Sequence, residues 1–481
     1  MNLADALDIH ARARPTHTAL IDGPRHITYA EVARSVRGLA SRLLALPPEA
    51  PVGVCLRDTA EHVLVLYALA RAGRAILPMD ARWTEAEKQN VAGHFGASLV
   101  LLEPDMACLP GLPCATVAEL AGWPAREFAF PREEAAPLVL SLSSGTTGRP
   151  KGPLVTHGQF LARFRTHWIN LGLNARDRFL CATPLYFGGG RTFAMSVLFS
   201  GGTVAMCPPP AAPEAIVGAI AAHGITSLFL VPTQLRRLLA LPDQALAPMR
   251  RLRLLFSSGA PLSREERVEI AARLCPEFFE YYASTEGGGV SLLTPADIAA
   301  HGESVGRPVF GVEVEVVDED GRALPPGETG LLRYRGPGCA TSYHRDPEAS
   351  AEAFRDGWFY PGDLASLDDE GFVTLRGRRK DMIIRAGINI HPADVEAALN
   401  AHPAVGESAV VAWPSREFGE EIAAFVRLSA PAGAEELLSF ARARLPRPKW
   451  PRAVFVVEDL PRNAGGKVLK RELAARLPPL P

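Results

Sequence analysis

One stretch constrains this chain more than any other: residues 138–152, which read LVLSLSSGTTGRPKG. It opens as a short apolar run of strand character and then becomes a loop rich in glycine and hydroxyl side chains. Such a loop brings backbone N–H groups, hydroxyls and the ammonium of Lys151 into one volume, which suits a polyphosphate. It lacks the Gly-Lys-Ser/Thr ending of a Walker A loop, because Gly152 follows Lys151. Composition alone fits a solvated turn between a strand and a helix equally well.

The overall composition narrows the class of protein. At 481 residues the chain is too long for one ordinary domain, so we expect a large core and a smaller unit. A net charge of −2 gives no reason to expect a nucleic acid or an anionic membrane as partner. The seven cysteines include no C-x-x-C pair, which indicates reduced thiols in a cytoplasmic protein. No apolar run approaches the ~18 residues of a membrane span, and the first residues lack the pattern of a signal peptide.

Hydrophobic periodicity predicts an α/β fold for the first three hundred residues. Strands alternate there with helices, which indicates parallel sheets joined by crossover helices. The expected helices are 31–44, 62–72, 158–168 and 213–223, and the expected strands are 52–56, 75–78, 203–206, 227–231 and 252–256. From Val312 the apolar residues alternate, so we expect antiparallel strands at 312–317 and 330–335, with hairpin-type turns at 318–321 and 368–371.

The last hundred residues predict a small α+β unit. Its expected strands are 382–385, 408–412, 423–428 and 454–457, and its expected helices are 392–401 and 435–445. We place the boundary in the charged run Arg378–Asp381, although such a run is also typical of a solvated turn. Residues 1–378 then form a large domain of mixed sheets, crossover helices and an antiparallel β portion, and residues 379–481 form the small domain.

The stretch Ser143-Ser144-Gly145-Thr146-Thr147-Gly148, with Lys151 after it, resembles the phosphate loop of the adenylate-forming superfamily. That superfamily contains acyl-CoA synthetases, peptide-synthetase adenylation domains and luciferases. Five further stretches resemble other motifs of the same superfamily and follow one another in the order that the superfamily has, so the resemblance covers nearly the whole chain. They are SGAPL at 258–262, YASTEG at 282–287, WFYPGD at 358–363, GRRKDMIIRAG at 377–387 and PRNAGGKV at 461–468. The resemblance implies a ligase that uses ATP, Mg²⁺ and coenzyme A.

The resemblance also assigns residues to the nucleoside. The backbone of Gly259 and Ala260 would pack against adenine, where small residues let a flat base approach the main chain. Tyr282 would stack on the base, beside Ala283 and Ser284. Asp363 would accept hydrogen bonds from the ribose hydroxyls, and Arg378 would reach the ribose or a phosphate. The family usually has glycine where Ala283 stands and often threonine where Pro361 stands.

A second group would serve the reacting phosphate. By resemblance Thr285 would donate a hydrogen bond to the α-phosphate, and Glu286 would bind Mg²⁺ together with Thr146. The chemistry agrees, because Mg²⁺ takes oxygen ligands and commonly shares one carboxylate with substrate phosphates. Lys467 would bridge the incoming carboxylate and the α-phosphate. An isolated lysine of this kind would otherwise be a solvated surface residue.

The small domain is implied to be mobile and to turn about a hinge at Asp381. In its second conformation Gly387 would line the tunnel for the pantetheine thiol of coenzyme A, where a side chain would obstruct. Lys467 and Gly387 would therefore serve different half-reactions from one domain.

The acyl pocket is less well defined. The segment at 181–191 aligns with the family segment that bounds this pocket, so we assign Phe187 and Gly188 to it, together with Tyr281 and Gly287. The glycine run at 287–289 predicts a roomy or backbone-lined pocket. Arg191 either binds a second carboxylate of the substrate or has a structural or solvated role. An apolar monocarboxylic acid, fatty or aromatic, is the expected substrate.

We therefore expect an acyl-CoA synthetase that adenylates a small carboxylic acid and passes the acyl group to coenzyme A. A stand-alone adenylation enzyme that loads the phosphopantetheine of a carrier protein is the alternative. A catalytically inactive nucleotide-binding regulator is a third possibility, against which the presence of both Glu286 and Lys467 argues. The sequence leaves open a monomer or a homodimer.

Overall fold

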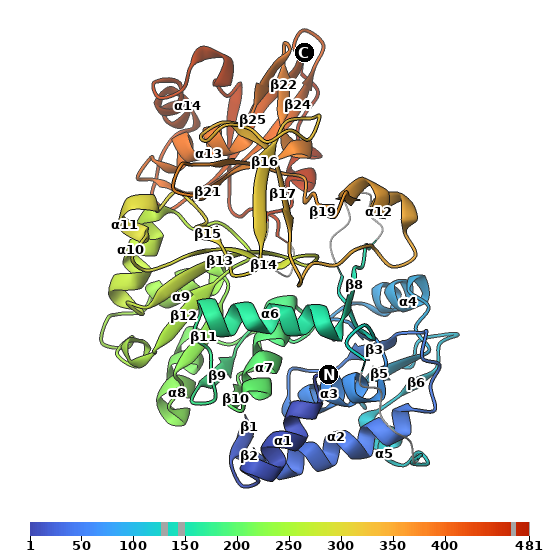
Figure 1. Ribbon diagram of the computed structural model, residues 1–481. Coiled ribbons are helices and arrows are strands. Elements are labelled where there is room, and N and C mark those ends of the chain that lie inside the picture. The colour runs from blue at the N-terminus through green and yellow to red at the C-terminus, as the bar shows by residue number, and fades with distance from the viewer. Residues whose placement is uncertain (127–132, 143–149, 463–467, 481) are drawn as a thin grey trace. The chain divides into compact units, whose positions relative to one another are not determined.

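The structure, a computed structural model, describes residues 1–126, 133–142, 150–462 and 468–480 (Figure 1). The chain forms two compact units. Unit 1 comprises Met1–Val314 and Tyr334–Phe359, and unit 2 comprises Glu315–Arg333 and Tyr360–Pro481. No helix in the described part of the chain is both long and apolar enough to cross a membrane. All seven cysteines are free thiols.

The larger sheet of unit 1 has nine strands in the order β15-β14-β13-β12-β11-β9-β10-β1-β2. The strands from β1 to β13 along this order are parallel, and the others pair antiparallel. Every residue of β10, β11 and β12 is buried, as expected for parallel strands covered on both faces. The bounds are β1 Thr18–Asp22, β2 Arg25–Thr28, β9 Arg178–Cys181, β10 Thr203–Met206, β11 Ser227–Leu230, β12 Leu254–Ser257, β13 Phe278–Ser284, β14 Gly288–Leu293 and β15 Arg307–Pro308.

The second sheet of unit 1 has the order β6-β5-β3-β4-β7-β8 and is parallel except for the β7–β8 pair. Strand β7 ends at Leu140, shortly before the predicted phosphate loop, and β8 begins shortly after it. The bounds are β3 Val52–Cys55, β4 Ile76–Pro78, β5 Leu99–Leu102, β6 Cys114–Ala115, β7 Pro137–Leu140 and β8 Leu154–Thr156.

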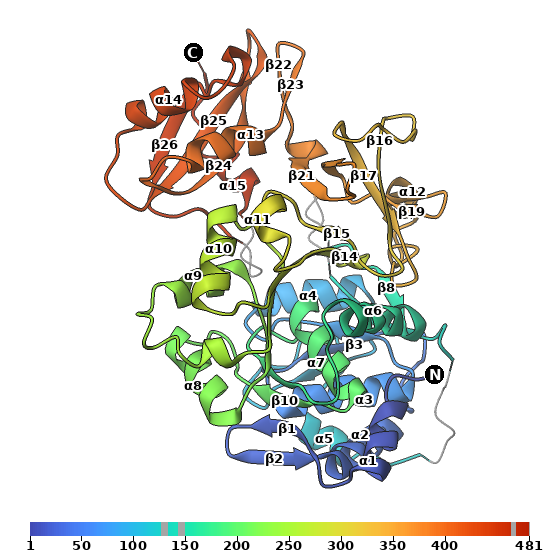
Figure 2. The same cartoon turned by 60° about the vertical axis from the view of Figure 1, so that its left-hand side comes forward.

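Helices cover these sheets, and local capping signals fix where several of them begin. Five start with a reciprocal Ser/Thr-x-x-Glu/Gln capping box, as at Thr156 and Gln159 ahead of α6. Helix α6 lies beside α7 (Figure 1), while α1 and α2 lie beside the β1–β2 hairpin (Figure 2). The bounds are α1 Asp5–Ala13, α2 Tyr29–Leu43, α3 Ala60–Ala72, α4 Glu85–His94, α5 Val117–Ala121, α6 His157–Asn170, α7 Gly188–Ser200, α8 Pro213–His223, α9 Pro232–Leu239, α10 Arg264–Arg273, α11 Ile298–His301 and α12 Pro347–Ala353.

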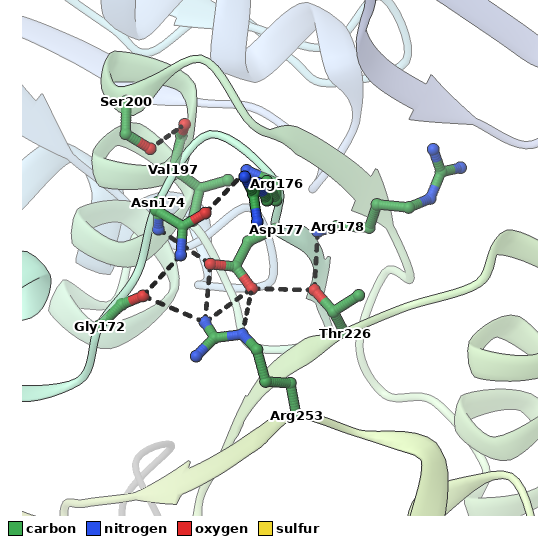
Figure 3. A network of polar contacts seen from close by, with 9 residues as sticks. All are labelled: Gly172, Asn174, Arg176, Asp177, Arg178, Val197, Ser200, Thr226 and Arg253. Carbon is green, nitrogen blue, oxygen red and sulfur yellow. Dashed lines mark hydrogen bonds and ion pairs between the residues drawn. The ribbon is translucent and has the colours of Figure 1, made fainter.

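A buried carboxylate joins three parallel strands at their amino-terminal ends (Figure 3). Asp177 precedes β9, Thr226 precedes β11 and Arg253 precedes β12. The Asp177 carboxylate accepts hydrogen bonds from the Thr226 hydroxyl at 2.9 Å and from the Arg253 guanidinium at 2.8 Å. This clamp fixes the relative position of the strands at one edge of the sheet, opposite to the edge where their carboxyl ends lie.

The division between the units passes through β16 (Glu313–Val317) and β17 (Thr329–Arg335). In unit 2 the beginning of β17 pairs antiparallel with β20 (Asp363–Leu367), which pairs in turn with β21 (Val373–Arg378). In unit 1 the end of β17 pairs with β19 (Trp358–Phe359), which pairs with β18 (Phe354–Arg355). The alternating pattern from Val312 thus predicted antiparallel pairing correctly.

The carboxyl-terminal part of unit 2 is a mixed sheet with helices and its own apolar core. Long strands β24 and β25 pair antiparallel, and β26 joins β25 in parallel. The bounds are β22 Ile383–Arg385, β23 Ile388–Ile390, α13 Pro392–Asn400, β24 Val405–Ser415, β25 Gly419–Leu428, α14 Ala434–Arg442, β26 Ala453–Val457 and α15 Lys470–Ala474. The α/β class with an antiparallel portion and an α+β end is confirmed, whereas the domain boundary after residue 378 stays a prediction.

Candidate active site

Several predicted site residues of unit 1 lie at or just after the carboxyl ends of neighbouring strands. Residues 258–262 follow β12, and Thr285, Glu286 and Gly287 follow β13, which is its parallel neighbour. Ligands of open α/β sheets bind at this edge. Gly259 is exposed and has φ +103°, a conformation that favours glycine. Ala260, Tyr282 and Thr285 are half-buried, and Ala283 is exposed.

The centre of the site is the Glu286 carboxylate, which is only 8% exposed. The hydroxyl of Tyr343 donates a hydrogen bond to its Oε1 at 2.9 Å. Its Oε2 accepts no hydrogen bond from the residues that the structure describes. In that same part of the chain no group of three or more His, Cys, Asp or Glu side chains is arranged to hold a metal ion. One carboxylate with one available oxygen fits a cation whose other ligands are substrate oxygens.

Arg163 of α6 holds the backbone around Glu286. Its guanidinium donates to the carbonyl oxygens of Glu286 at 2.8 Å, Thr285 at 3.2 Å and Gly338 at 2.9 Å. The side chain is buried, and the loss of hydration lowers the pKa of the guanidinium. The backbone N–H of Ala340 donates to the same Glu286 carbonyl at 2.8 Å. The loop that carries the carboxylate is therefore fixed from two directions.

Ser284 closes the turn ahead of this loop. Its hydroxyl oxygen accepts a hydrogen bond from the backbone N–H of Gly287 at 2.7 Å and a second one from the hydroxyl of Tyr334 at 2.6 Å. Ser284, predicted to contact the nucleotide, thus has a structural task as well.

Tyr343 also contacts the segment that follows the predicted phosphate loop. The Nζ atom of Lys151 lies 5.5 Å from the centroid of the Tyr343 ring. Pro153 pairs with Tyr343 in an isolated antiparallel bridge, and the N–H of His344 donates to the carbonyl of Gly152 at 2.7 Å. Tyr343 and Arg163 were not predicted to be site residues. Arg163 offered one sequence signal, since it lies on the apolar face formed by Phe160, Phe164 and His167.

The acyl-pocket residues lie in two parts of unit 1. Phe187 is half-buried at the N-cap of α7, and Gly188 begins that helix and is exposed. Tyr281 is buried, and its hydroxyl donates to the Thr166 hydroxyl at 2.9 Å. Gly287 lines a small hollow together with Ala162, Arg163, Thr166, Gly289, Phe310, Val312, Pro337 and Gly338.

Side chains pack closely around the glycine run at 287–289, and the roomy or backbone-lined pocket expected there stays a prediction. A Cβ atom on Gly287 would lie 2.4 Å from the Tyr334 ring, and one on Gly289 would lie 1.9 Å from the Tyr281 ring. On Gly288 it would lie 2.9 Å from Arg163. The packing requires glycine at these three positions, because neighbouring side chains occupy the space that a Cβ atom would need.

Arg191 has contacts that favour its structural role. It is 1% exposed, and its guanidinium donates to the carbonyls of Leu185 and Tyr186 and to the hydroxyl of Ser141 at 3.0 Å. Burial lowers its pKa to about 9. The guanidinium thus ties the start of α7 to the end of the β7 segment. A role toward a second substrate carboxylate stays a prediction.

Two of the predicted residues of unit 2 form an ion pair. Asp363 and Arg378 are register partners on β20 and β21, and the Arg378 Nε lies 2.6 Å from the Asp363 carboxylate. Asp381 ends a 3₁₀ turn, Arg379–Asp381, directly after β21. Gly387 is exposed between β22 and β23 with φ +81°. Seven predicted residues lie outside the described ranges: Ser143, Ser144, Gly145, Thr146, Thr147, Gly148 and Lys467.

The sequence of this chain is similar to those of characterised enzymes. The profile described as "AMP-binding enzyme" matches residues 7–344, and "AMP-binding enzyme C-terminal domain" matches residues 394–467. A feruloyl-CoA synthase of Amycolatopsis is 33% identical, with 97% of each chain covered. The indoleacetate–CoA ligase of Aromatoleum aromaticum is 32% identical, with 99% of each covered. A fatty acid–[acyl-carrier-protein] ligase, ScoC of Streptomyces coeruleorubidus, is 32% identical over 98% of this chain and 96% of its own.

Solved structures agree with these matches. ATP-bound MatB from Rhodopseudomonas palustris superposes with a TM-score of 0.89 at 29% identity, with 99% of each chain covered. MenE from Bacillus subtilis, an O-succinylbenzoate coenzyme A synthetase in complex with ATP and a magnesium ion, has a TM-score of 0.88 at 28% identity. The matched part covers 97% of this chain and 98% of MenE.

Proposed function

Because this chain belongs to the adenylate-forming family of AMP-binding enzymes, we propose that it is an ATP-dependent acid–thiol ligase that makes an acyl-CoA. In the first half-reaction a carboxylate oxygen attacks the α-phosphorus of ATP. The bond to the β-phosphate oxygen breaks, and acyl-AMP and pyrophosphate result. In the second, the thiol of coenzyme A attacks the acyl carbon, loses its proton to solvent and displaces AMP.

The observation that carries this proposal is the buried Glu286 carboxylate, one oxygen of which accepts a hydrogen bond from Tyr343 while the other accepts none from the described residues. Two anions, the acid and the α-phosphate, must approach each other, so cations and oriented donors at that point supply much of the catalysis. Glu286, with Thr146, would hold Mg²⁺, which neutralises phosphate charge when it is bound. Thr285 and Thr147 would donate hydrogen bonds to phosphate oxygens, and Lys467 would hold the acid carboxylate beside the phosphate.

The nucleoside and the thiol would be bound by other parts of the chain. Gly259, Ala260 and Tyr282 would receive the adenine. Asp363 would accept from the ribose hydroxyls. Arg378, bound to Asp363, would orient that carboxylate. Gly387 would leave room for the pantetheine arm after unit 2 residues turn about Asp381. A cytoplasmic location fits the free cysteines.

The proposed acid carries an aromatic ring. Two of the similar ligases are named for feruloyl and indoleacetate substrates, both aromatic. Phe187, half-buried at the start of α7, offers an aromatic side chain that cannot hydrogen-bond. An aromatic monocarboxylic acid is therefore favoured over a dicarboxylic acid, since Arg191 is engaged by backbone carbonyls.

A carrier protein is the second candidate acceptor, because ScoC, a ligase of fatty acids to acyl-carrier protein, covers nearly the whole chain at similar identity. The stretch from Gly377 to Gly387 resembles the CoA ligases, and this favours free coenzyme A.

The test measures pyrophosphate release from ATP and Mg²⁺ over a panel of aromatic and fatty acids, first with coenzyme A and then with a phosphopantetheinylated carrier protein. We expect acid-dependent release, with a lower apparent KM for coenzyme A than for the carrier. Glu286→Gln is the matched control, since it keeps the shape of the side chain and removes its charge. No release with any acid, or release that Glu286→Gln leaves unchanged, would overturn the proposal.

A further inference from the structure

We propose that Tyr343 is a positioning residue that holds two opposite charges, the Glu286 carboxylate and the Lys151 ammonium, in place for metal-bound ATP. This inference rests on the proposed function and deepens it, because it says what keeps these two groups in register. Tyr343 itself touches neither the reacting atoms nor the acid in this scheme. Its hydroxyl acts on one charge and its ring on the other.

The hydroxyl fixes the rotation of the carboxylate. Tyr343 and Glu286 are each 8% exposed, so their 2.9 Å hydrogen bond is shielded from water. A hydrogen bond to an ionised group is about twice as strong as one between neutral groups. Because Oε1 is bound, the side chain presents Oε2 in one direction. The backbone of Glu286 is held separately by Arg163 and Ala340, so loss of the hydroxyl would free the carboxylate without releasing the loop.

The ring and backbone of Tyr343 fix the segment after the phosphate loop. An ammonium within about 6 Å of an aromatic centroid is attracted by the ring face, and Lys151 Nζ lies at 5.5 Å. The bridge between Pro153 and Tyr343 holds the same segment through the main chain. Lys151 thus keeps both a side-chain and a nearby backbone link to the residue that orients Glu286.

Tyr343 is itself anchored from the other side. Its backbone N–H donates to the Ser350 hydroxyl at 2.9 Å, and Ser350 belongs to α12. Its ring lies 5.3 Å from the ring of Phe354 at an edge-on angle of 65°. Because Tyr343 is itself held in place, it can orient the two charged groups that it contacts. Loss of a residue that orients a metal ligand in this way typically costs roughly 10–100-fold in metal affinity or activity.

The test is calorimetric titration of the whole protein with ATP, with Mg²⁺ and with EDTA, for wild type, Tyr343→Phe and Tyr343→Leu. Tyr343→Phe keeps the ring over Lys151, so we expect unchanged affinity for metal-free ATP and an affinity for Mg·ATP that is weaker by about 10-fold or more. Tyr343→Leu also removes the ring, and it should weaken both. Tyr67→Phe is the matched control, because the buried Tyr67 hydroxyl donates to the Met195 carbonyl in the core.

A second measurement asks whether the hydroxyl acts through the carboxylate. In a Glu286→Gln background, Tyr343→Phe should change Mg·ATP affinity by much less than it does in wild type, because both changes affect one interaction. The proposal would be overturned if Tyr343→Phe bound Mg·ATP as tightly as the wild type does, or if it lost affinity for ATP equally with and without metal. A Tyr343→Phe protein that does not fold would also overturn it. No acid or thiol is needed, so a failed ligase assay would not count against it.

Discussion

The two units differ in where they place their charges. Unit 1 buries several of them: Arg163, Arg191, Glu286 and the ion pair of Arg267 with Glu280. Unit 2 has ion pairs closer to the surface, such as Arg379 with Glu319, whose side chains are 53% and 82% exposed. Buried charges cost free energy unless they are well bonded, while exposed pairs are screened by water. The groups around Glu286 are therefore held in one geometry by the core of unit 1. Unit 2 also buries carboxylates, those of Asp363 and Glu421, but each is paired with an arginine that is partly exposed.

The sharpest test of this difference breaks one ion pair in each unit. Glu280→Ala leaves Arg267 charged and unpaired in the interior, so we expect unfolding free energy to fall by about 3–5 kcal/mol. Glu319→Ala should change it little, because Arg379 stays hydrated. Urea unfolding of both variants gives the comparison. Similar losses from the two substitutions would remove the distinction between the units.

The second test concerns Lys467, which lies outside the described residues but belongs to the chain of unit 2. Its ammonium is needed only while the acid and the α-phosphate are forced together. Lys467→Ala should therefore slow pyrophosphate release by about 10²–10³-fold, as removal of one electrostatic contact typically does. The same variant should pass chemically prepared acyl-AMP to coenzyme A at nearly the wild-type rate. Normal adenylation by Lys467→Ala would remove the residue from the mechanism.

Much of this architecture was predictable from local patterns. Helix 213–223 and strand 203–206 agree with α8 and β10 residue by residue, because a proline start, a glycine end and a buried apolar run mark them. The helix α7 was missed, since three glycines at its start resemble a loop. There Gly190 is required by close packing, as a Cβ would lie 2.4 Å from the carbonyls of Thr183 and Pro184.

Site residues were predictable only where they belong to a recognisable sequence motif. Glu286 stands in such a motif, whereas Tyr343 and Arg163 reach it from 57 and 123 residues away along the chain. Contacts of that kind depend on how β13, α6 and the segment before α12 pack, and no local pattern encodes them. The side chains that pack against the glycine run were not predictable either, because Tyr281 and Tyr334 come from other strands.

Acidification should affect unit 1 more than unit 2. Burial lowers the pKa of His62 and of His157 to about 4 and that of His167 to about 3, against 6.5 in an unfolded chain. The unfolded state therefore binds more protons in this window. The contribution of each neutral buried histidine to the unfolding free energy is fully present above pH 6.5 and is lost as the pH falls toward the pKa of the folded state. The loss amounts to roughly 2 kcal/mol per histidine at about pH 5.

Hydrogen exchange resolved by peptide, at pH 7.5 and at pH 5, would measure this loss in each unit. In unit 2 His391 is half-buried, and burial lowers its pKa too, so a smaller response is expected there. His167→Phe removes one titrating ring from a cluster in which it lies 4.3 Å from Phe193, and it should make the pH dependence of unit 1 shallower. Equal protection losses in both units would contradict the account.

A smaller effect is expected at the acyl pocket. Phe187→Ala should shift the preference of the enzyme toward bulkier acids, with each methylene worth ~1–3 kcal/mol of discrimination. The ratio of kcat/KM values for a short and a bulky aromatic acid measures this shift. Phe440→Ala is a control in unit 2, where a half-buried phenylalanine packs against His402. An unchanged acid profile in Phe187→Ala would take this residue out of the pocket.

The smallest expected effect tests whether residues of unit 2 turn about Asp381. Proline fixes φ near −65° and removes the backbone N–H, so Asp381→Pro would restrict the 3₁₀ turn after β21 to a narrow range of conformations. Adenylation and thioester formation should then slow by unequal factors, several-fold apart, because Lys467 and Gly387 serve different half-reactions. Single-turnover rates of the two half-reactions give the ratio. Asp369→Pro provides the control, since Asp369 occupies the second position of the turn closed by the Gly371 N–H and the Asp368 carbonyl, where proline is favoured. Equal slowing of both half-reactions by Asp381→Pro would place the hinge elsewhere in the chain.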